Sequence, residues 1–395
     1  MTRTQMVLCV LALMAGVGTV PTEAQRAAGA SADTVVALKR QLGKRQLGTT
    51  EKPHFVEAEF LPGHGMNLLQ IKAYLPGKGV VDLLASPPLA EALARLDGDD
   101  PYGNEAFKMG GAFLLPYANR IRGKLTADGK SIDVDLAGQE VQLPANWKGN
   151  NPGAELHAMH GLMLKAKFQD VVVRNGKERS TLSATLHAGN FGGHWPSRTD
   201  VRIEARLSDE ALELWVTAVN VGKQRLPMAI GMHPYFAFPS GDRAQSRVHL
   251  PAMMRAPANN YDDTFATGAL EPVEGTRFDF TAAEGRALDG DYLDDSFTDL
   301  QRGASDGVRG RGAAEVRVSD PAANYGMKVM AISREIKAIQ VYAPTGKNFV
   351  AIEPQYNLSD PFDARVWGGR DAGVVFLKPG ESTTWHVRFE IYGLR

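Results

Sequence analysis

Three short segments, far apart in the chain, carry side chains that can transfer a proton or hold a fixed positive charge. Arg120 lies in the first, His233 in the second and Glu353 in the third, each close to proline or aromatic residues in strand-like sequence. A histidine, a carboxylate and a fixed cation are the groups that paired proton transfer needs. Polar groups in such surroundings are poor core residues. We therefore take these three as candidate site residues.

The sequence around His233 and Glu353 constrains both side chains. His233 precedes Pro234, and a proline restricts the residue before it to extended geometry, so the backbone sets the direction of the imidazole. On residue type alone, a structural histidine is the commoner case. Glu353 follows the apolar run 349–352 and precedes Pro354. Burial there raises the pKa of a carboxyl group and makes it a stronger base. A buried glutamate needs a partner, either for catalysis or as a structural ion pair with an arginine.

Further polar residues are suited to binding hydroxyl groups. Arg120 offers a planar set of donors for hydroxyls or a carboxylate, although it could also be a surface arginine before a hairpin. Asn119 is a candidate ligand or a residue that serves only the turn. Asp294 and Asp295 are adjacent. Such a pair usually forms a solvated turn, but one carboxylate could accept hydrogen bonds from two hydroxyls. Asp294 is the favoured candidate of the two.

Four histidines raise the question of a metal site. They are His157, His160, His187 and His194. Their spacing does not define a zinc site. We therefore expect no metal, and His160, beside Gly161, is better explained as a donor to a hydroxyl. The sequence also lacks a glycine-rich phosphate loop, and we expect no cofactor.

Strands must position these residues. Apolar and polar residues alternate over 201–207, 212–218 and 385–391, which predicts half-buried strands. Asn-Gly at 175–176 and Asp-Gly at 128–129 lie between strand-like stretches and are typical of tight hairpins with positive φ. Consecutive strands joined by hairpins predict an all-β fold with antiparallel sheet, as a sandwich or a barrel.

Composition narrows the classes of partner. The chain has 44 basic and 45 acidic residues and 44% hydrophobic residues. This balance suits an ordinary soluble core and argues against nucleic acid as a partner. Glycine (41) and proline (22) are plentiful, which favours many turns and short strands. The one clear short helix is predicted over 89–96.

The N-terminus predicts export. Arg3 precedes the apolar run 6–17, and a Thr-Glu-Ala sequence at 22–24 resembles a cleavage site, so we expect a signal peptide over 1–24. The apolar run is short for a bilayer; the alternative is a buried N-terminal helix. Cys9, the only cysteine, lies in this segment. The mature chain would then be periplasmic or secreted, without cysteine and without a membrane partner.

The rest of the chain divides into two parts. The segment 25–52 is rich in alanine, arginine and glutamine, and we expect a flexible tether that includes a short helix over 32–42. The strand-like pattern begins near residue 53 and continues to the end, so a single β domain is expected over 53–395.

Five pieces of this domain, in this order, resemble the aldose 1-epimerase (galactose mutarotase-like) family. No single piece is specific, but the five together are. They are Pro116-Tyr117-Ala118-Asn119-Arg120-Ile121 with its following hairpin, Leu143-Pro144-Ala145-Asn146 with His160-Gly161, Gly231-Met232-His233-Pro234-Tyr235-Phe236, Leu293-Asp294-Asp295-Ser296-Phe297, and Ile352-Glu353-Pro354-Gln355.

This resemblance implies a large antiparallel β-sandwich that binds a small sugar and interconverts the α and β anomers of a free aldose. It implies that Glu353 is the base that takes the C1 hydroxyl proton and that His233 is the acid that protonates the ring oxygen. Arg120, His160 and Asp294 would hold the hydroxyls. The reaction needs neither metal nor redox cofactor.

Because the sequence departs from the family pattern, it does not specify which sugar is bound. Leu162 and Phe168 stand where the family usually has a glycine and a tryptophan. Alternatives are a non-catalytic carbohydrate-binding protein of the same fold, or a hydrolase or lyase acting on polysaccharide, in which Glu353 and Asp294 or Asp295 would form the carboxylate pair. A sugar-phosphate epimerase is a weaker alternative.

Four aromatic residues are further candidates, for stacking on a sugar ring. They are Trp147, Trp195, Trp367 and Tyr235. Each is individually more typical of a core or of the rim of a site.

Overall fold

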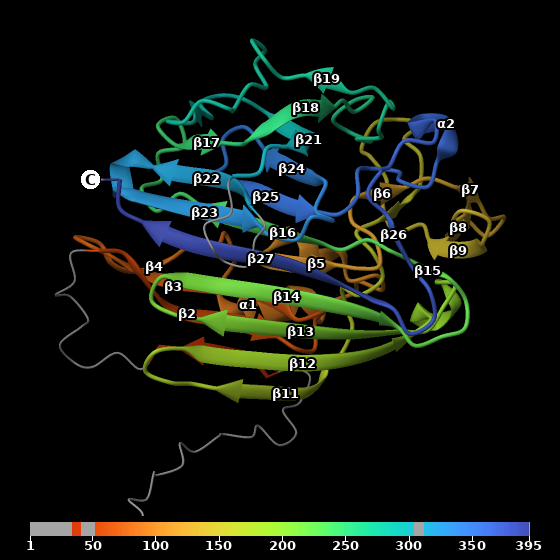
Figure 1. The fold of residues 1–395 in the computed structure, drawn as a ribbon, viewed down its shortest axis with the longest axis horizontal. Helices are drawn as coiled ribbons and strands as arrows, with labels where there is room; N and C mark the ends of the chain where they lie inside the picture. The colour runs from red at the N-terminus through yellow and green to blue at the C-terminus, as the bar shows by residue number, and fades with distance from the viewer. Residues whose placement is uncertain (1–33, 41–51, 304–311, 395) are drawn as a thin grey trace, which may run out of the picture.

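Two large antiparallel sheets lie face to face and form a sandwich (Figure 1). The computed structural model describes residues 34–40, 52–303 and 312–394. Within them, no helix is long and apolar enough to cross a membrane. The segment 1–24, for which the sequence predicts a signal peptide, lies outside the described residues. The predicted fold class, a large antiparallel β-sandwich, is confirmed.

The larger sheet has eleven strands, and its order mixes distant parts of the chain. In sheet order the strands are β1 (Val36–Lys39), β2 (His54–Leu61), β3 (Asn67–Leu75), β5 (Gly111–Leu114), β16 (Gly231–Ala237), β25 (Phe349–Gln355), β24 (Ala338–Ala343), β21 (Leu293–Leu300), β18 (Ala252–Ala256) and β19 (Glu271–Pro272), with β4 (Gly79–Asp82) beside β3.

The smaller sheet has nine strands and contains the longest hairpins. In sheet order the strands are β11 (Gln169–Arg174), β12 (Ser180–Gly189), β13 (Thr199–Leu207), β14 (Ala211–Asn220), β27 (Ser382–Tyr392), β23 (Tyr325–Ala331), β22 (Ala314–Asp320), β17 (Arg247–His249) and β20 (Arg286–Ala287). The predicted strands at 201–207, 212–218 and 385–391 are confirmed as parts of β13, β14 and β27.

Three small sheets and a few short helices complete the fold. The small sheets are β6 (Arg120–Ile121) with β10 (Ala158–Met159), β15 (Leu226–Met228) with β26 (Val375–Leu377), and β7 (Lys124–Leu125) with β8 (Ser131–Asp135) and β9 (Glu140–Pro144). The helices are α1 (Leu89–Leu96), α2 (Ala364–Trp367) and the 3-10 turns η1 (Asn104–Lys108), η2 (Phe191–Gly193) and η3 (Pro321–Ala323). The helix predicted at 89–96 is confirmed as α1.

Aromatic side chains between the two sheets form the centre of the core. Phe113 of β5 and Trp385 of β27 have ring centroids 6.2 Å apart, and Phe236 of β16 and Phe389 of β27 have centroids 5.5 Å apart. All four side chains are almost fully buried. Edge-to-face pairs of this kind contribute about 0.5–1.5 kcal/mol each beyond the burial of their area. They fix the large sheet against the small one.

The hairpin predictions are confirmed, with one detail corrected. Strands β7 and β8 flank the Asp-Gly turn at 128–129, and β11 and β12 flank the Asn-Gly turn at 175–176. Gly129 has the expected positive φ of 68°. The φ of Gly176 is not positive. Its turn runs on to Arg179 before β12 begins, and this longer connection does not need the mirror-image geometry of a two-residue turn.

The expected helix over 32–42 is wrong. Residues 36–39 form β1, which pairs with β2 at the edge of the large sheet. Leu38 is fully buried, and Lys39 is held across to the small sheet, because its N–H donates to Asn175 Oδ1 at 2.9 Å and its C=O accepts from Ser180 Oγ at 2.6 Å. Tertiary contacts have overridden local helix propensity here. Part of the segment expected to be a tether is therefore a strand.

Candidate active site

Strand alternation places the two candidate proton-transfer groups on the same side of the large sheet. In β16, Met232 and Phe236 point into the core between the sheets, so His233 points away from it. In β25, Ile352 points into the core and Glu353 points away. We call this side, which faces away from the small sheet, the outer face.

Strand register brings these groups into one row across the outer face. Strands β16 and β25 are paired so that His233 lies opposite Glu353. Glu353 is paired with Gln340 of β24, and Gln340 with Ser296 of β21. Four strands, of which only β24 and β25 are consecutive in the chain, thus contribute neighbouring polar side chains. These polar side chains can be buried because their neighbours in the row are polar partners.

His233 and Glu353 contact each other directly. Nε2 of His233 lies 3.2 Å from Oε1 of Glu353, and both side chains are buried. The other carboxylate oxygen of Glu353 accepts a hydrogen bond of 2.8 Å from Nε2 of Gln355. Nδ1 of His233 is buried without a hydrogen-bond partner in the described structure. In this arrangement a base and an acid can share one proton between His233 Nε2 and Glu353 Oε1.

A loop and a short sheet bring Arg120 and His160 to the same place. Strands β6 and β10 pair Arg120 with Met159, and the N–H of His160 donates to the C=O of Asn119 at 2.9 Å. The ring of His160 lies 5.3 Å from the ring of His233. Gly161 follows with φ of 82°, and a Cβ atom there would lie 2.1 Å from the carbonyl oxygen of Leu115. Gly161 is therefore required by the backbone that positions His160.

Asp294 joins a closed set of polar contacts with Arg120. Gln340 Nε2 donates to Asp294 Oδ1 at 2.6 Å, and Asn119 Nδ2 donates to Gln340 Oε1 at 3.2 Å. Arg120 Nη1 donates to Asn119 Oδ1 at 3.0 Å, and its Nη2 lies 3.9 Å from Asp294 Oδ2. Ser296 also donates to Gln340. Each member fixes the orientation of the next, which preorganises the group for polar ligands.

Asp295 is placed differently from Asp294. It has the same strand parity as Leu293 and Phe297, which point into the core between the sheets. Its carboxylate accepts hydrogen bonds from Arg255 Nη1 at 2.7 Å and from the hydroxyl of Tyr261 at 2.8 Å. Asp294 is thus the member of this pair that lies with the candidate residues.

Burial shifts the pKa values of the buried groups toward their neutral forms. Burial lowers the pKa of His233 to about 3, and the charge of Arg120 acts in the same direction. Burial, with the charges of His233 and Arg120, holds the pKa of His160 well below its usual value. Burial, with the charge of Asp294, raises the pKa of Glu353 well above its usual value, against the effects of Gln355 and Arg120.

These shifts bear on the contact between His233 and Glu353. The contact can be an ion pair or a neutral hydrogen bond between an imidazole and a carboxylic acid. The two forms carry the same total charge and differ only in the position of one proton. Burial favours the neutral form, and we adopt it for the ligand-free site. A bound ligand that needs the charged form must stabilise it.

The four aromatic candidates separate into two groups. Trp195 and Trp367 are almost fully buried, and their indole N–H groups donate to backbone carbonyls, so they are core residues. Tyr235 stacks on His233 with ring centroids 4.6 Å apart. Trp147 packs against Phe107, whose ring lies 4.7 Å from that of His160. Tyr235 and Trp147 therefore lie at or near the candidate site.

The histidines considered as zinc ligands do not come together. In the described residues, no group of three or more histidine, cysteine, aspartate or glutamate side chains could hold a metal. His187 pairs with Asp200 at 3.0 Å, and Nδ1 of His194 contacts the C=O of Gln142 at 2.6 Å. His157 is buried, with Nδ1 2.9 Å from the C=O of Glu155.

Sequence reasoning missed Gln340 and Gln355. Both are fully or almost fully buried and hydrogen-bond to candidate site residues. A signal for Gln340 existed, because it interrupts an otherwise apolar strand with a polar side chain. Its partners come from other strands, so its role depends on strand pairing that one sequence does not specify.

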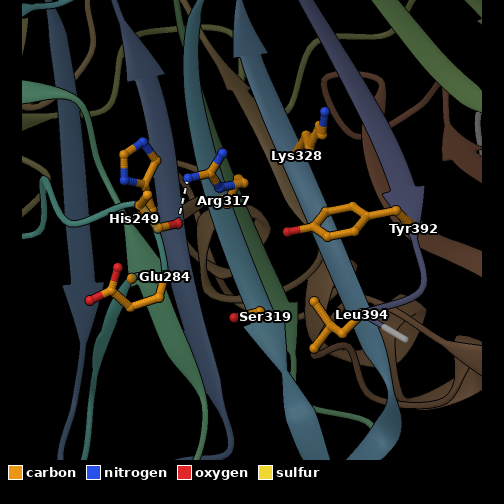
Figure 2. A pocket seen from close by; sticks show the side chains of 9 residues that line it. His249, Glu284, Arg317, Ser319, Lys328, Tyr392 and Leu394 are labelled. Atoms are coloured by element: carbon orange, nitrogen blue, oxygen red, sulfur yellow. Dashed lines mark hydrogen bonds between the residues drawn. The ribbon is translucent and has the colours of Figure 1, made fainter.

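A separate groove of about 470 Å³ lies on the small sheet (Figure 2). Figure 2 shows the ring of Tyr392 between Lys328 and Leu394. Arg317 and Lys328 already pair with Glu315, at 3.1 and 3.4 Å. Among the described residues, the groove's histidine, His249, forms no ion pair with a carboxylate like that of His233 with Glu353. The outer face of the large sheet is therefore the better candidate for an active site.

Comparison with known proteins assigns the class. The family model for aldose 1-epimerase matches residues 85–390, so the chain belongs to the aldose 1-epimerase family. No curated protein matches the chain.

Solved structures show the same fold at low sequence identity. A galactose mutarotase-like protein from Clostridium acetobutylicum has a TM-score of 0.67 and 18% identity, with 88% of this chain and 94% of that chain covered. An aldose epimerase homologue from C. elegans has a TM-score of 0.63 and 17% identity, with 92% and 99% covered. Galactose 1-epimerase from Lactobacillus acidophilus has a TM-score of 0.59 and 16% identity, with 91% and 99% covered.

Proposed function

We propose that the protein is an aldose 1-epimerase that interconverts the α and β anomers of a free aldose. The observation that carries the proposal is the direct contact of 3.2 Å between His233 Nε2 and Glu353 Oε1. The ring oxygen and the C1 hydroxyl of a cyclic aldose are bonded to the same carbon. An acid and a base that touch each other therefore match the two atoms that must exchange protons.

The reaction would run in two matched proton transfers. The Glu353 carboxylate takes the proton of the C1 hydroxyl while protonated His233 gives its proton to the ring oxygen. The bond between C1 and the ring oxygen breaks and leaves an open-chain aldehyde. After rotation about the bond between C1 and C2, the reverse transfers close the ring on the other face. Each general acid or base typically contributes a factor of about 10²–10⁴.

The protonation states of the pair support this cycle. Ring opening converts the ion pair of Glu353 and His233 into the neutral pair, and ring closure restores the ion pair. Burial favours the neutral pair, which is the state that accompanies the open-chain intermediate. The positive charge of Arg120 favours ionised Glu353, which is needed to begin, but it disfavours protonated His233. A bound sugar must therefore stabilise the ion pair for the ring to open.

The remaining candidates would bind the sugar hydroxyls. Arg120, Asn119 and Asp294 are held by mutual hydrogen bonds, and His160 lies beside His233. We propose that Arg120, Asp294 and His160 contact the hydroxyls directly and that Asn119 assists Arg120. A non-catalytic binder would not need the contact between His233 and Glu353. We also propose export to the periplasm or the medium, on the strength of the signal-like segment 1–24.

Polarimetry tests the function. Freshly dissolved α-D-glucose and α-D-galactose are followed with and without the protein. The proposal predicts that the approach to the equilibrium rotation is faster with the protein, in proportion to its concentration. Release of reducing ends from a glycan panel, with no effect on the monosaccharides, would instead support the hydrolase alternative.

A further inference from the structure

A run of tyrosine rings leads from His233 to the surface. Tyr235 stacks on His233, and the next ring, Tyr342, lies 6.5 Å from Tyr235. Tyr292 follows at 6.3 Å from Tyr342, and Tyr261 at 5.1 Å from Tyr292. Tyr235 is buried, Tyr342 and Tyr292 are partly exposed, and Tyr261 is 37% exposed.

Tyr261 is exposed but held in place. Its hydroxyl donates to Asp295 Oδ2 at 2.8 Å and accepts from Arg277 Nη2 at 2.9 Å. Asp295 is itself bound by Arg255 at 2.7 Å. Both hydrogen-bonding functions of the hydroxyl are thus engaged, so the ring loses little freedom when a ligand packs on it. Such preorganisation favours binding. The ring of Tyr261 is exposed, so its packing in the core does not account for the two hydrogen bonds that hold its hydroxyl.

The exposed end of the run lies next to the proposed hydroxyl-binding group. Tyr292 immediately precedes β21 and has the parity of Asp294, two residues later. The segment that carries Tyr261 also carries Thr264, whose hydroxyl donates to Asp294 Oδ2 at 3.3 Å. Burial and the nearby charge of Asp294 raise the pKa of Tyr292 to about 12. A sugar held at Asp294 therefore has aromatic surface beyond it.

We propose that Tyr261 and Tyr292 form a second sugar subsite, so that the substrate is the reducing-end unit of a disaccharide or longer oligosaccharide. This inference rests on the proposed function. The aldose ring would react at His233 and Glu353, and its far side would point toward Asp294. A glycosidic bond on that side would place the next ring over the tyrosines. The C–H face of a pyranose is apolar and suits an aromatic surface.

The test compares a disaccharide with its own reducing unit. Polarimetry would measure kcat/KM for α-D-glucose, α-lactose and β-maltose, each freshly dissolved, with wild type and Tyr261→Ala. We expect wild type to prefer at least one disaccharide over glucose. Tyr261→Ala should lower kcat/KM for that disaccharide about tenfold, through KM, and leave glucose unchanged. Tyr261→Phe keeps the ring and should retain most of the preference.

The outcomes separate this inference from the proposed function. Acceleration of glucose without a preference for either disaccharide would overturn the second subsite and leave the epimerase proposal standing. Equal losses for glucose and disaccharide in Tyr261→Ala would also overturn it, because they indicate general damage to the site. Melting temperatures of the variants would show whether the fold is intact. No acceleration of any of the three sugars would overturn both proposals.

Discussion

Asp294 and Asp295 are neighbours in the chain but project from opposite faces of strand β21. Asp294 accepts a hydrogen bond from Gln340 at 2.6 Å on the outer face, and Asp295 accepts one from Arg255 at 2.7 Å on the other side. The same chemical group thus has two environments one residue apart. We propose that the first carboxylate binds the sugar and that the second has a structural role.

This difference predicts separate effects of two matched substitutions. Asp294→Asn should raise KM about tenfold with a smaller effect on stability, because it removes a charged ligand. Asp295→Asn should lower the free energy of unfolding by about 2 kcal/mol, because hydrogen bonds to a charged group are lost. Its KM for a monosaccharide should change little. Steady-state kinetics and urea unfolding of both variants would check this, and the reverse pattern would contradict the assignment.

The pH dependence of the rate should report the environment of Glu353. The reaction needs one proton on the pair of His233 and Glu353, and that proton is lost above the raised pKa of Glu353, so the rate should fall as pH rises through this pKa. The hydrogen bond from Gln355 lowers that pKa. Gln355→Met removes this bond and should move the midpoint of the alkaline limb to higher pH. The exposed Gln224→Met is the matched control. An unchanged midpoint in Gln355→Met would show that Glu353 does not set the limb.

Acid should destabilise the fold through buried His157. Burial lowers its pKa from 6.5 to about 4. Below pH 6.5 the unfolded chain therefore binds a proton that the folded chain does not, and stability is lost as pH falls. The loss amounts to about 2 kcal/mol by about pH 5. In His157→Asn this part of the pH dependence should vanish, whereas His187→Asn, at an exposed site, should retain it. Urea unfolding at several pH values measures both slopes.

Gly161 should tolerate no side chain. A Cβ atom there would lie 2.1 Å from the carbonyl oxygen of Leu115, and the residue has φ of 82°. Gly161→Ala should therefore lower stability by about 3 kcal/mol or more and displace His160. Gly129→Ala is the control, because its φ is 68° and nothing lies within 4 Å of its Cβ. That variant should lose only about 1 kcal/mol. Similar losses in the two variants would show that the clash is relieved.

The fold could be predicted from local sequence patterns because a half-buried strand alternates apolar and polar residues. Alternation along β13, β14 and β27 reflects one buried face, and the hairpin dipeptides mark their turns. Strand β1 could not be predicted in this way. Its burial comes from β2 and from Asn175 and Ser180, which lie far along the chain. Local composition there favoured a helix.

The candidate site could be predicted only in part. His233 and Glu353 could be identified from the sequence because each lies beside a proline in unusual surroundings and matches a family motif. The row that joins them to Gln340 depends on the register of β16, β25 and β24, and one sequence does not specify register. The catalytic and binding roles of these residues remain predictions.

The central claim is that Glu353 is the base of an aldose 1-epimerase. The most direct measurement is polarimetry of α-D-glucose and α-D-galactose with wild type and Glu353→Gln side by side, with sugar binding followed by calorimetry. The account predicts that wild type accelerates mutarotation and that Glu353→Gln binds sugar but loses the acceleration by a factor of about 10² or more. Full acceleration by Glu353→Gln would contradict the claim.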